Sequence, residues 1–218
     1  MNETSLIDAL LGTAGDGGKP DDQASHQHSN IITPTLRREA PKRRFERIGR
    51  EEACALQIGS LPEPGQEIIM LMSGNWHGFD LVTSILNLAH PATIRHLYVA
   101  SLGFNRVQAQ HLARLFDQGL VESIAMVFSE IFSEKSNGEY AQLVGLMQAR
   151  GQKVSASRNH AKIITTELSD GRKFVCHGSL NLRRCNAIEQ VALSADADLY
   201  RFFTDYIKEQ TQCPKQPI

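Results

Sequence analysis

Between residues 67 and 151, short apolar runs alternate with longer segments whose apolar residues recur at helical spacing. The run Glu67–Met72 is typical of a buried strand, and in Phe79–Leu88 the apolar residues lie three or four positions apart, as on one face of a helix. The same alternation predicts further strands and helices at His96–Leu102, Val107–Phe116, Val121–Phe128 and Tyr140–Met147. Strands that alternate with helices of about ten residues are typical of a mostly parallel sheet with helices on its faces.

The pattern changes after Gly151, where strands follow one another closely. A short strand begins at Val154, and the apolar runs His160–Thr166 and Arg172–His177 flank an Asp-Gly pair at residues 170 and 171. An Asp-Gly pair between two such runs favours a β-hairpin. A strand at residues 188–193 and a helix at residues 197–207 complete the pattern. We therefore expect an α/β fold with a mixed, mostly parallel β-sheet flanked by helices.

The N-terminal part differs in composition. Residues 1–45 are poor in large apolar side chains, and Gly12–Asn30 has almost nothing to bury, so we predict a disordered tail and a folded domain at residues 46–218. The two histidines of this tract, His26 and His28, are weak evidence for a metal site. The tail ends in a basic linker, because Arg37–Arg50 holds seven Arg or Lys against two Glu. Such a run is either a solvated linker or a contact for a polyphosphate backbone.

Charge, cysteines and hydropathy narrow the classes of protein. The formal net charge of −1 does not by itself indicate a nucleic-acid partner. The four cysteines lie far apart without a C-x-x-C pair, so they form neither a disulfide framework nor a zinc pattern. The sequence has no secretory signal and no apolar stretch of spanning length. These features predict a cytoplasmic protein with reduced thiols and no membrane partner.

The predicted hairpin carries a cluster of polar residues. His160 and Lys162 are two positions apart at the start of its first strand, so their side chains would share a face. The second strand ends at Gly178-Ser179-Leu180-Asn181, which the hairpin returns to the start of the first strand. Glu189 follows eight residues after Asn181, on the next strand. We therefore expect an imidazole, an ammonium, a hydroxyl and a carboxamide to converge.

This order, His-x-Lys, a hairpin, Gly-Ser-x-Asn and a downstream Glu, resembles the signature of the phospholipase D superfamily, and most of all its small members with one motif per chain, several of which are nucleases. The resemblance is sharp over residues 160–189 and looser, but consistent in strand and helix order, from about residue 67. One position departs from the pattern. Glu167 stands where the family often has Asp, in a stretch a few residues longer than usual, which puts the role of Glu167 in doubt.

The resemblance implies a mechanism that needs no metal and no cofactor. His160 would attack a phosphodiester phosphorus to give a phosphohistidine, which water then hydrolyses. Lys162, Ser179 and Asn181 match the positions that stabilise the charge of the five-coordinate phosphorus. Glu189 would accept a hydrogen bond from the other ring nitrogen of His160. A second histidine must protonate the leaving oxygen, so the resemblance implies a two-fold homodimer that contributes one motif from each subunit.

Four further residues are candidates for substrate binding, each with a structural alternative. His77 follows the first strand of the alternating region and either lines the site or is an exposed residue at a helix start. Phe104 follows another strand end and either stacks a base or packs in the core beside a helix N-cap at Asn105. Arg183 and Arg184 either hold flanking phosphates or are solvated charges.

The sequence thus predicts a homodimeric phosphodiesterase acting on DNA or RNA, as an endonuclease of low sequence selectivity. A lipid-directed phosphodiesterase is a rival, against which the lack of a membrane-binding amphipathic helix counts. A nucleic-acid-binding module without catalysis is the rival from another class. Intact His160, Lys162, Asn181 and Glu189 favour catalysis, because a module that only binds needs no nucleophile.

Overall fold

The computed structural model describes residues 41–49, 53–73, 76–185 and 187–212. The predicted tail up to residue 40, with His26 and His28, lies outside the described residues, as does the end of the basic run at Arg50. The boundary between tail and domain at residue 45 therefore stays a prediction, although a strand already begins at Lys42.

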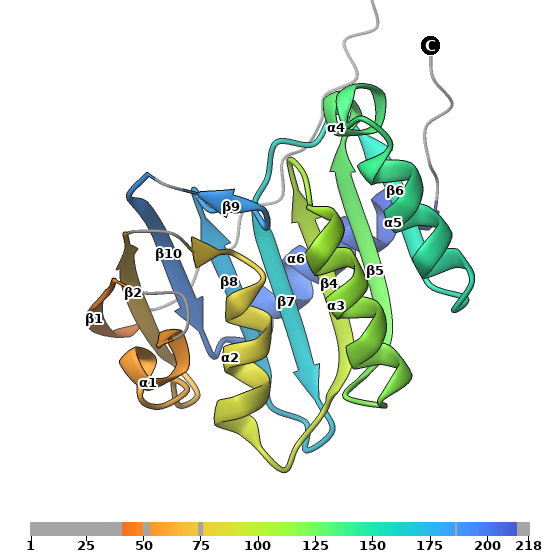
Figure 1. Ribbon diagram of the computed structural model, residues 1–218. Helices are drawn as coiled ribbons and strands as arrows, with labels where there is room; N and C mark the ends of the chain where they lie inside the picture. Colours follow the sequence, from red (N-terminus) through yellow and green to blue (C-terminus); the bar gives the residue numbers. More distant parts are fainter. Residues whose placement is uncertain (1–40, 50–52, 74–75, 186, 213–218) are drawn as a thin grey trace, which may run out of the picture. The chain divides into compact units, whose positions relative to one another are not determined.

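One eight-stranded sheet organises the described domain (Figure 1). Its strands, in spatial order, are β1 (Lys42–Ile48), β2 (Gln66–Met72), β10 (Glu189–Ser194), β8 (Lys173–Gly178), β7 (Ile163–Leu168), β4 (Ile94–Ser101), β5 (Val121–Ser129) and β6 (Lys153–Ser157). The pairs β1–β2, β4–β5 and β5–β6 are parallel, and the other four are antiparallel. Six strands therefore run in one direction, and only β7 and β10 run against them. The predicted mixed α/β class is confirmed.

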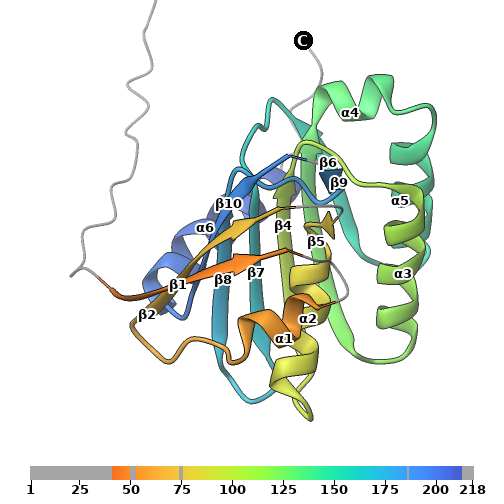
Figure 2. The same cartoon turned by 60° about the vertical axis from the view of Figure 1, so that its left-hand side comes forward.

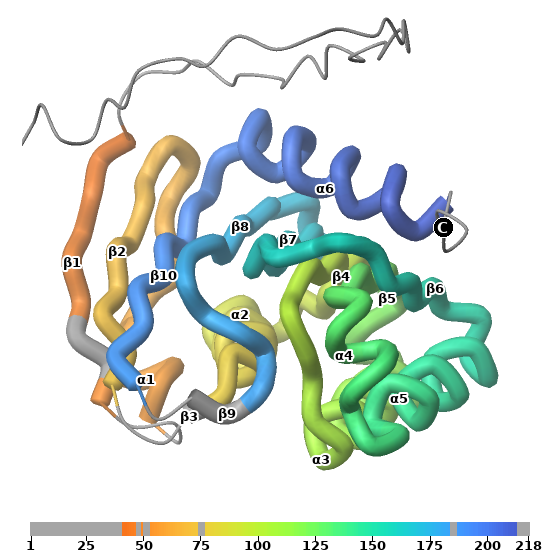
Figure 3. Tube along the Cα trace, turned by 90° about the horizontal axis from the view of Figure 1, so that it is seen from above, coloured from red at the N-terminus to blue at the C-terminus, as the bar shows by residue number. Residues whose placement is uncertain are grey.

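Helices cover both faces of the sheet (Figures 2 and 3). The long helix α6 (Ala197–Gln212) packs on one face, where it contacts β4 to β8. On the other face lie α1 (Cys54–Ile58), α2 (Asp80–Ala89), α3 (Arg106–Asp117) and α5 (Glu139–Gln148). A short helix, α4 (Glu130–Lys135), follows β5 directly at the end of the sheet. No described helix combines the length and the apolar character needed to cross a bilayer.

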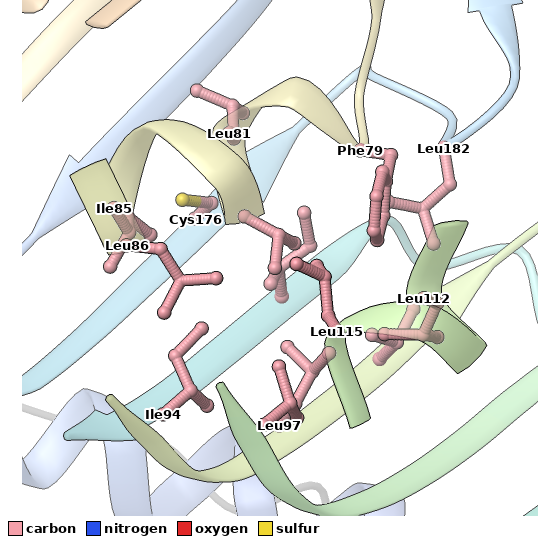
Figure 4. Packing of buried hydrophobic residues seen from close by; sticks show 14 of the residues in the cluster. Phe79, Leu81, Ile85, Leu86, Ile94, Leu97, Leu112, Leu115, Cys176 and Leu182 are labelled. Carbon is pink, nitrogen blue, oxygen red and sulfur yellow. The ribbon is translucent and has the colours of Figure 1, made fainter. Parts of the chain in front are cut away.

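The main core lies between the sheet and the helices α2 and α3 (Figure 4). Leu81, Ile85 and Leu86 of α2 are buried at spacings that place them on one side of the helix. They face a set of apolar side chains from α3, β4 and β8, which includes Leu112, Leu115, Ile94, Leu97 and Cys176. Burial of each large apolar side chain contributes about 1.5–3 kcal/mol, so this layer fixes α2 and α3 against the sheet.

The helices that follow β4 and β5 each begin with a side-chain N-cap, at the end of the sheet where these two strands end. The side chain of Asn105 accepts a hydrogen bond from the backbone N–H of Gln108 at 2.9 Å and so caps α3, as predicted for this residue. In the same way, the hydroxyl of Ser129 accepts one from the N–H of Phe132 and caps α4. The loops after β4 and β5 therefore have fixed positions next to the start of β7.

Several elements were not predicted from the sequence. One of them is strand β1, which is formed by part of the basic run. The others are short: the helices α1 and α4, and the pair of two-residue strands β3 (Trp76–His77) and β9 (Arg184–Cys185). β1 lies at the edge of the sheet, where Lys42, Arg43 and Phe45 are exposed, so its sequence lacks the apolar alternation of an inner strand. The first hairpin strand is also shorter than predicted, because β7 begins at Ile163 and not at His160.

Candidate active site

The residues of the His-x-Lys and Gly-Ser-x-Asn motifs lie together at one end of the sheet, the upper edge in Figure 1. The start of β7 adjoins the end of β8, since Ile163 pairs with His177 and the N–H of Gly178 donates to the carbonyl of Lys162 at 3.4 Å. The start of β10 lies on the other side of β8, where Val191 pairs with Gly178. The antiparallel strands β7 and β10 thus bring three separate sequence segments to the same end of the sheet: the start of β7, the end of β8 and the start of β10.

His160 and Lys162 contact each other directly. The Nζ of Lys162 lies 3.2 Å from Nδ1 of His160 and donates to the backbone carbonyl of His160 at 2.9 Å. His160 is exposed and Lys162 is half-buried, so the imidazole faces solvent while the ammonium lies beside it. With Nδ1 next to the ammonium, Nε2 is the ring nitrogen that a substrate can approach.

Ser179 and Glu189 form the second part of the site. The hydroxyl of Ser179 donates to Oε2 of Glu189 and accepts a hydrogen bond from the N–H of Gln190 at 3.0 Å. Among the described residues, the ring of His160 makes its polar contact with Lys162, so the predicted bond from the imidazole to Glu189 is not formed in this structure. Ser179 thus fixes the carboxylate of Glu189, and the hydroxyl proton of Ser179 is used in this hydrogen bond.

Gly178 allows this arrangement. A Cβ atom at residue 178 would clash with the backbone carbonyl oxygen of Gln190, so any larger residue would push β10 away from β8. The glycine of Gly-Ser-x-Asn is therefore required by the close approach of two strands at this point.

Asn181 is oriented by the loop after β4. Its Oδ1 accepts a hydrogen bond from the backbone N–H of Leu102 at 3.3 Å, so its amide nitrogen points the other way and is left to donate. The next residue, Leu182, donates its N–H to the hydroxyl of Ser101 at 3.2 Å. On the other side, Gly78 approaches so closely that a Cβ there would lie 2.5 Å from the carbonyl oxygen of Asn181. One loop thus holds the carboxamide of Asn181, and the other packs against its backbone.

Asn159 holds the segment that carries His160, and no sequence motif includes it. Its side chain is 4% exposed. The amide nitrogen donates to the carbonyl of Ser101 at 3.2 Å, and Oδ1 accepts from the N–H of Ala161 at 3.0 Å and from the hydroxyl of Tyr206 at 3.1 Å. One buried carboxamide therefore links the end of β4, the start of β7 and helix α6 directly beside the candidate nucleophile.

His77 lies at the rim of the site. Its Nδ1 is 3.4 Å from the amide nitrogen of Asn105, and its backbone N–H donates to Asp80 at 3.1 Å. In the β3–β9 pair it stands opposite Arg184, immediately after the Gly-Ser-x-Asn loop. The structure thus places His77 next to the motif, and its role in substrate binding stays a prediction.

The predictions for the other substrate-binding candidates have different outcomes. The stacking role considered for Phe104 is wrong, because its ring is 1% exposed and packs edge-to-face on Phe79 at 5.7 Å between centroids. Arg183 is exposed and lines the same cavity as His160. The backbone of Arg184 pairs with His77, but its side chain lies outside the described part of the structure.

Glu167 and the buried thiols lie outside the candidate site. Glu167 accepts a hydrogen bond from the hydroxyl of Tyr200 at 3.1 Å, near the far end of β7, which fits a structural role. Burial raises the pKa of the Cys54 thiol, and it does the same for the pKa of Cys176. Both thiols therefore remain protonated at neutral pH, as expected of small core residues.

No group of three or more His, Cys, Asp or Glu side chains within the described ranges could hold a metal ion. The positive charge nearest to the candidate nucleophile is the ammonium of Lys162. Because an ammonium beside an imidazole can neutralise a phosphate oxygen while the ring nitrogen approaches phosphorus, the cluster suits attack on a phosphate ester.

No family model and no curated protein matches the sequence. Among solved structures, the chain is similar to Nuc, a phospholipase D family member from Salmonella typhimurium, at 13% identity and a TM-score of 0.46, over 66% of this chain and 93% of that one. It is also similar to the polyphosphate kinase from Porphyromonas gingivalis (18% identity, TM-score 0.45, 69% of this chain and 23% of that one). A third similar structure is TrmBL2, an archaeal chromatin protein (11% identity, TM-score 0.43, 65% of this chain and 50% of that one).

These likenesses concern the fold alone. The chemistry rests on this chain's own residues: His160, Lys162, Asn181 and Glu189 stand in the order of the phospholipase D signature, and the sheet brings their segments to one edge. The sequence resemblance to that signature therefore has a structural counterpart at one end of a mixed sheet.

Proposed function

We propose that the protein is a metal-independent phosphodiesterase that cleaves nucleic acid, DNA or RNA, as an endonuclease through a phosphohistidine intermediate. The observation that supports this most is the pair of His160 and Lys162, 3.2 Å apart, at the end of the sheet where Asn181 is held by the loop after β4. In this proposal the imidazole is the nucleophile, and the ammonium and the Asn181 amide bind the phosphate.

The chemical steps follow from this arrangement. A bound phosphate draws the ammonium of Lys162 away from Nδ1 of His160, and the ring proton then resides on Nδ1. Nε2 attacks phosphorus, an Nε2–P bond forms, and the P–O bond to the leaving group breaks. Lys162 and the amide of Asn181 stabilise the charge that develops on the phosphoryl oxygens. The leaving oxygen takes a proton from a second imidazole, and water later breaks the Nε2–P bond with that imidazole as base.

The second imidazole is supplied, in this proposal, by His160 of a second copy of the chain. An exposed imidazole at the edge of the sheet is accessible to a two-fold partner that presents the same edge. Sedimentation should therefore show a dimer. In mixtures of wild-type protein and His160→Ala protein, activity should fall as the square of the wild-type fraction, because every active site needs both imidazoles. A linear fall would show that one imidazole per site suffices.

The experiment that tests the catalytic proposal compares wild type, His160→Ala and His90→Ala on single-stranded DNA, double-stranded DNA and RNA in EDTA. His90 is an exposed histidine outside the site, so its replacement controls for the general loss of an imidazole. Cleavage should persist in EDTA, disappear in His160→Ala and remain in His90→Ala. Cleavage lost in EDTA and restored by magnesium, or equal in wild type and His160→Ala, would contradict the mechanism. Binding without cleavage in wild type would favour the non-catalytic module.

A further inference from the structure

A cavity of about 540 Å³ opens beside His160, between the start of α3, the helix α4 and the loop after the Gly-Ser-x-Asn motif. Its lining includes His160 and three cationic side chains, Arg106, Lys135 and Arg183. These residues come from four segments that are far apart in sequence. The cavity is within the range of about 300–1,000 Å³ that is typical of sites for small molecules or single units of a polymer.

Among the described residues, the cations of this cavity form no ion pair, whereas many arginines elsewhere do. In the described ranges, the arginines with a carboxylate within 4.0 Å include Arg43, Arg44, Arg95, Arg150, Arg158, Arg172 and Arg201. By contrast, neither Arg106, Arg183 nor Lys135 forms an ion pair within the part of the chain that the structure describes. Of the described residues that line the cavity, Glu139 is the one with a carboxylate. The cavity thus combines three unpaired cations with one anion, which favours an anionic ligand.

The wall of the cavity also has an apolar part. Ile131 of α4 is 64% exposed and lines the cavity, while Phe132 below it is 6% exposed. The helix is held in place because the hydroxyl of Ser129 caps it and also donates to the carbonyl of Leu102 at 3.2 Å. An exposed apolar side chain on a fixed helix, in a cavity that also holds cationic groups, can contact the face of a sugar or an unpaired base.

We propose that this cavity binds the nucleotide next to the scissile phosphodiester in a single-stranded polynucleotide. Arg106, Lys135 and Arg183 bind the flanking phosphates, and Ile131 contacts the unpaired base or its sugar. A base that is paired in a duplex cannot enter a cavity of this size with its partner attached. The inference rests on the proposed function for the position of the scissile phosphate at His160, and it extends that function to a substrate class.

Binding tests the inference independently of cleavage. Two triple variants are compared, both in a His160→Ala background that prevents cleavage. The cavity variant is Arg106→Gln/Lys135→Gln/Arg183→Gln. The control variant, Arg114→Gln/Lys153→Gln/Arg201→Gln, removes the same charge from exposed positions outside the cavity. Affinity for a fluorescein-labelled single-stranded 12-mer is measured by anisotropy at several salt concentrations. The cavity variant should bind at least about tenfold more weakly, and the slope of log K against log salt should fall by about 0.7 per lost phosphate contact. The control should bind within about threefold of its parent.

Cleavage assays then separate this inference from the proposed function. The same triples are made with His160 intact, and kcat/KM is measured for the 12-mer and for bis(p-nitrophenyl) phosphate, a diester with no flanking phosphate. The ratio of the two kcat/KM values should fall at least about tenfold in the cavity variant and stay unchanged in the control variant. Equal affinities of the two triples, or equal affinity of the cavity for duplex and single strand, would overturn the inference while cleavage continues. Weaker binding by the cavity triple alone, in a protein that cleaves nothing, would support the cavity and reject the proposed function.

Discussion

Replacement of Asn159 should disturb catalysis through the position of His160. In Asn159→Ala, three hydrogen bonds of 3.2 Å or shorter are lost, to the carbonyl of Ser101, the N–H of Ala161 and the hydroxyl of Tyr206. At about 1 kcal/mol for each bond, the free energy of unfolding should fall by about 3 kcal/mol. For a domain of this size, that corresponds to a decrease in Tm of about 6–12 °C.

The loss of activity should exceed what this loss of stability explains. The chain immediately before β7 is tied to β4 and α6 through Asn159, so its removal lets His160 move relative to Lys162 and Asn181. A displacement of about 1 Å of a reacting group can reduce the rate about 100-fold. We expect kcat to fall by about that factor at 20 °C, where the variant remains folded, while the affinity for nucleic acid changes little.

Two controls make this prediction sharp. Tyr206→Phe removes a single hydrogen bond to Asn159, and burial raises the pKa of Tyr206, so the lost group is a protonated donor at neutral pH. It should cost about 1 kcal/mol and couple to Asn159→Ala in a double-mutant cycle. Thr165→Val removes the buried contact to Thr204 (3.1 Å between hydroxyls) that also joins β7 to α6. It should cost a similar amount of stability without a change in kcat.

Urea unfolding and single-turnover cleavage, measured on the same preparations, provide the comparison. An Asn159→Ala protein with normal stability would refute the account of its hydrogen bonds. An Asn159→Ala protein that is less stable but has a wild-type kcat would refute the positioning role. If Asn159→Ala does not fold, Tyr206→Phe alone still tests the role, because it should lower kcat more than Thr165→Val does.

Three further predictions concern other parts of the domain. Gly178→Ala should push β10 away from β8 at the carbonyl of Gln190, so urea titration should show a free energy of unfolding lower by about 1–3 kcal/mol, and a cleavage assay should show a lower rate. Normal values for both would contradict the predicted clash. Phe104→Ala should cost about 3–5 kcal/mol by urea unfolding but leave the affinity for nucleic acid unchanged, and weaker binding by the folded variant would revive the stacking role. The thiols of Cys54 and Cys176 should resist alkylation by iodoacetamide until urea unfolds the protein, because burial raises both pKa values. Rapid alkylation of either thiol in the folded protein, detected by mass spectrometry, would argue against the buried positions.

The sequence predicted the parts of the fold that have a strong periodic signal. The inner strands and the helices α2, α3, α5 and α6 carry apolar residues at a spacing of two or of three to four, and they form close to the expected ranges. Strand β1 was missed because an edge strand with exposed Lys42, Arg43 and Phe45 has no buried face to mark it. Short elements such as α4 and the β3–β9 pair depend on contacts between distant segments.

The candidate site shows the same division. The convergence of His160, Lys162, Ser179 and Asn181 followed from a hairpin signal, since a hairpin brings the start of one strand to the end of the next. The partner of Glu189 could not be predicted, because it depends on how β10 is aligned with β8. Asn159 and the cavity cations Arg106 and Lys135 belong to no motif, and only the packing of β4, α3, α4 and α6 around β7 gives them a role.

The position of β10 has a consequence for synthesis of the chain. Although it is the last strand in sequence, it lies between β2 and β8, so it joins β1 and β2 to the rest of the sheet. During translation, β4, β5 and β6 can pair as they emerge, and the β7–β8 hairpin can close locally. By contrast, β1 and β2 can pair only with each other until residues 189–194 are available to join them to the other strands. The same segment brings Glu189, so a nascent chain on the ribosome would hold His160 and Lys162 without the complete candidate site.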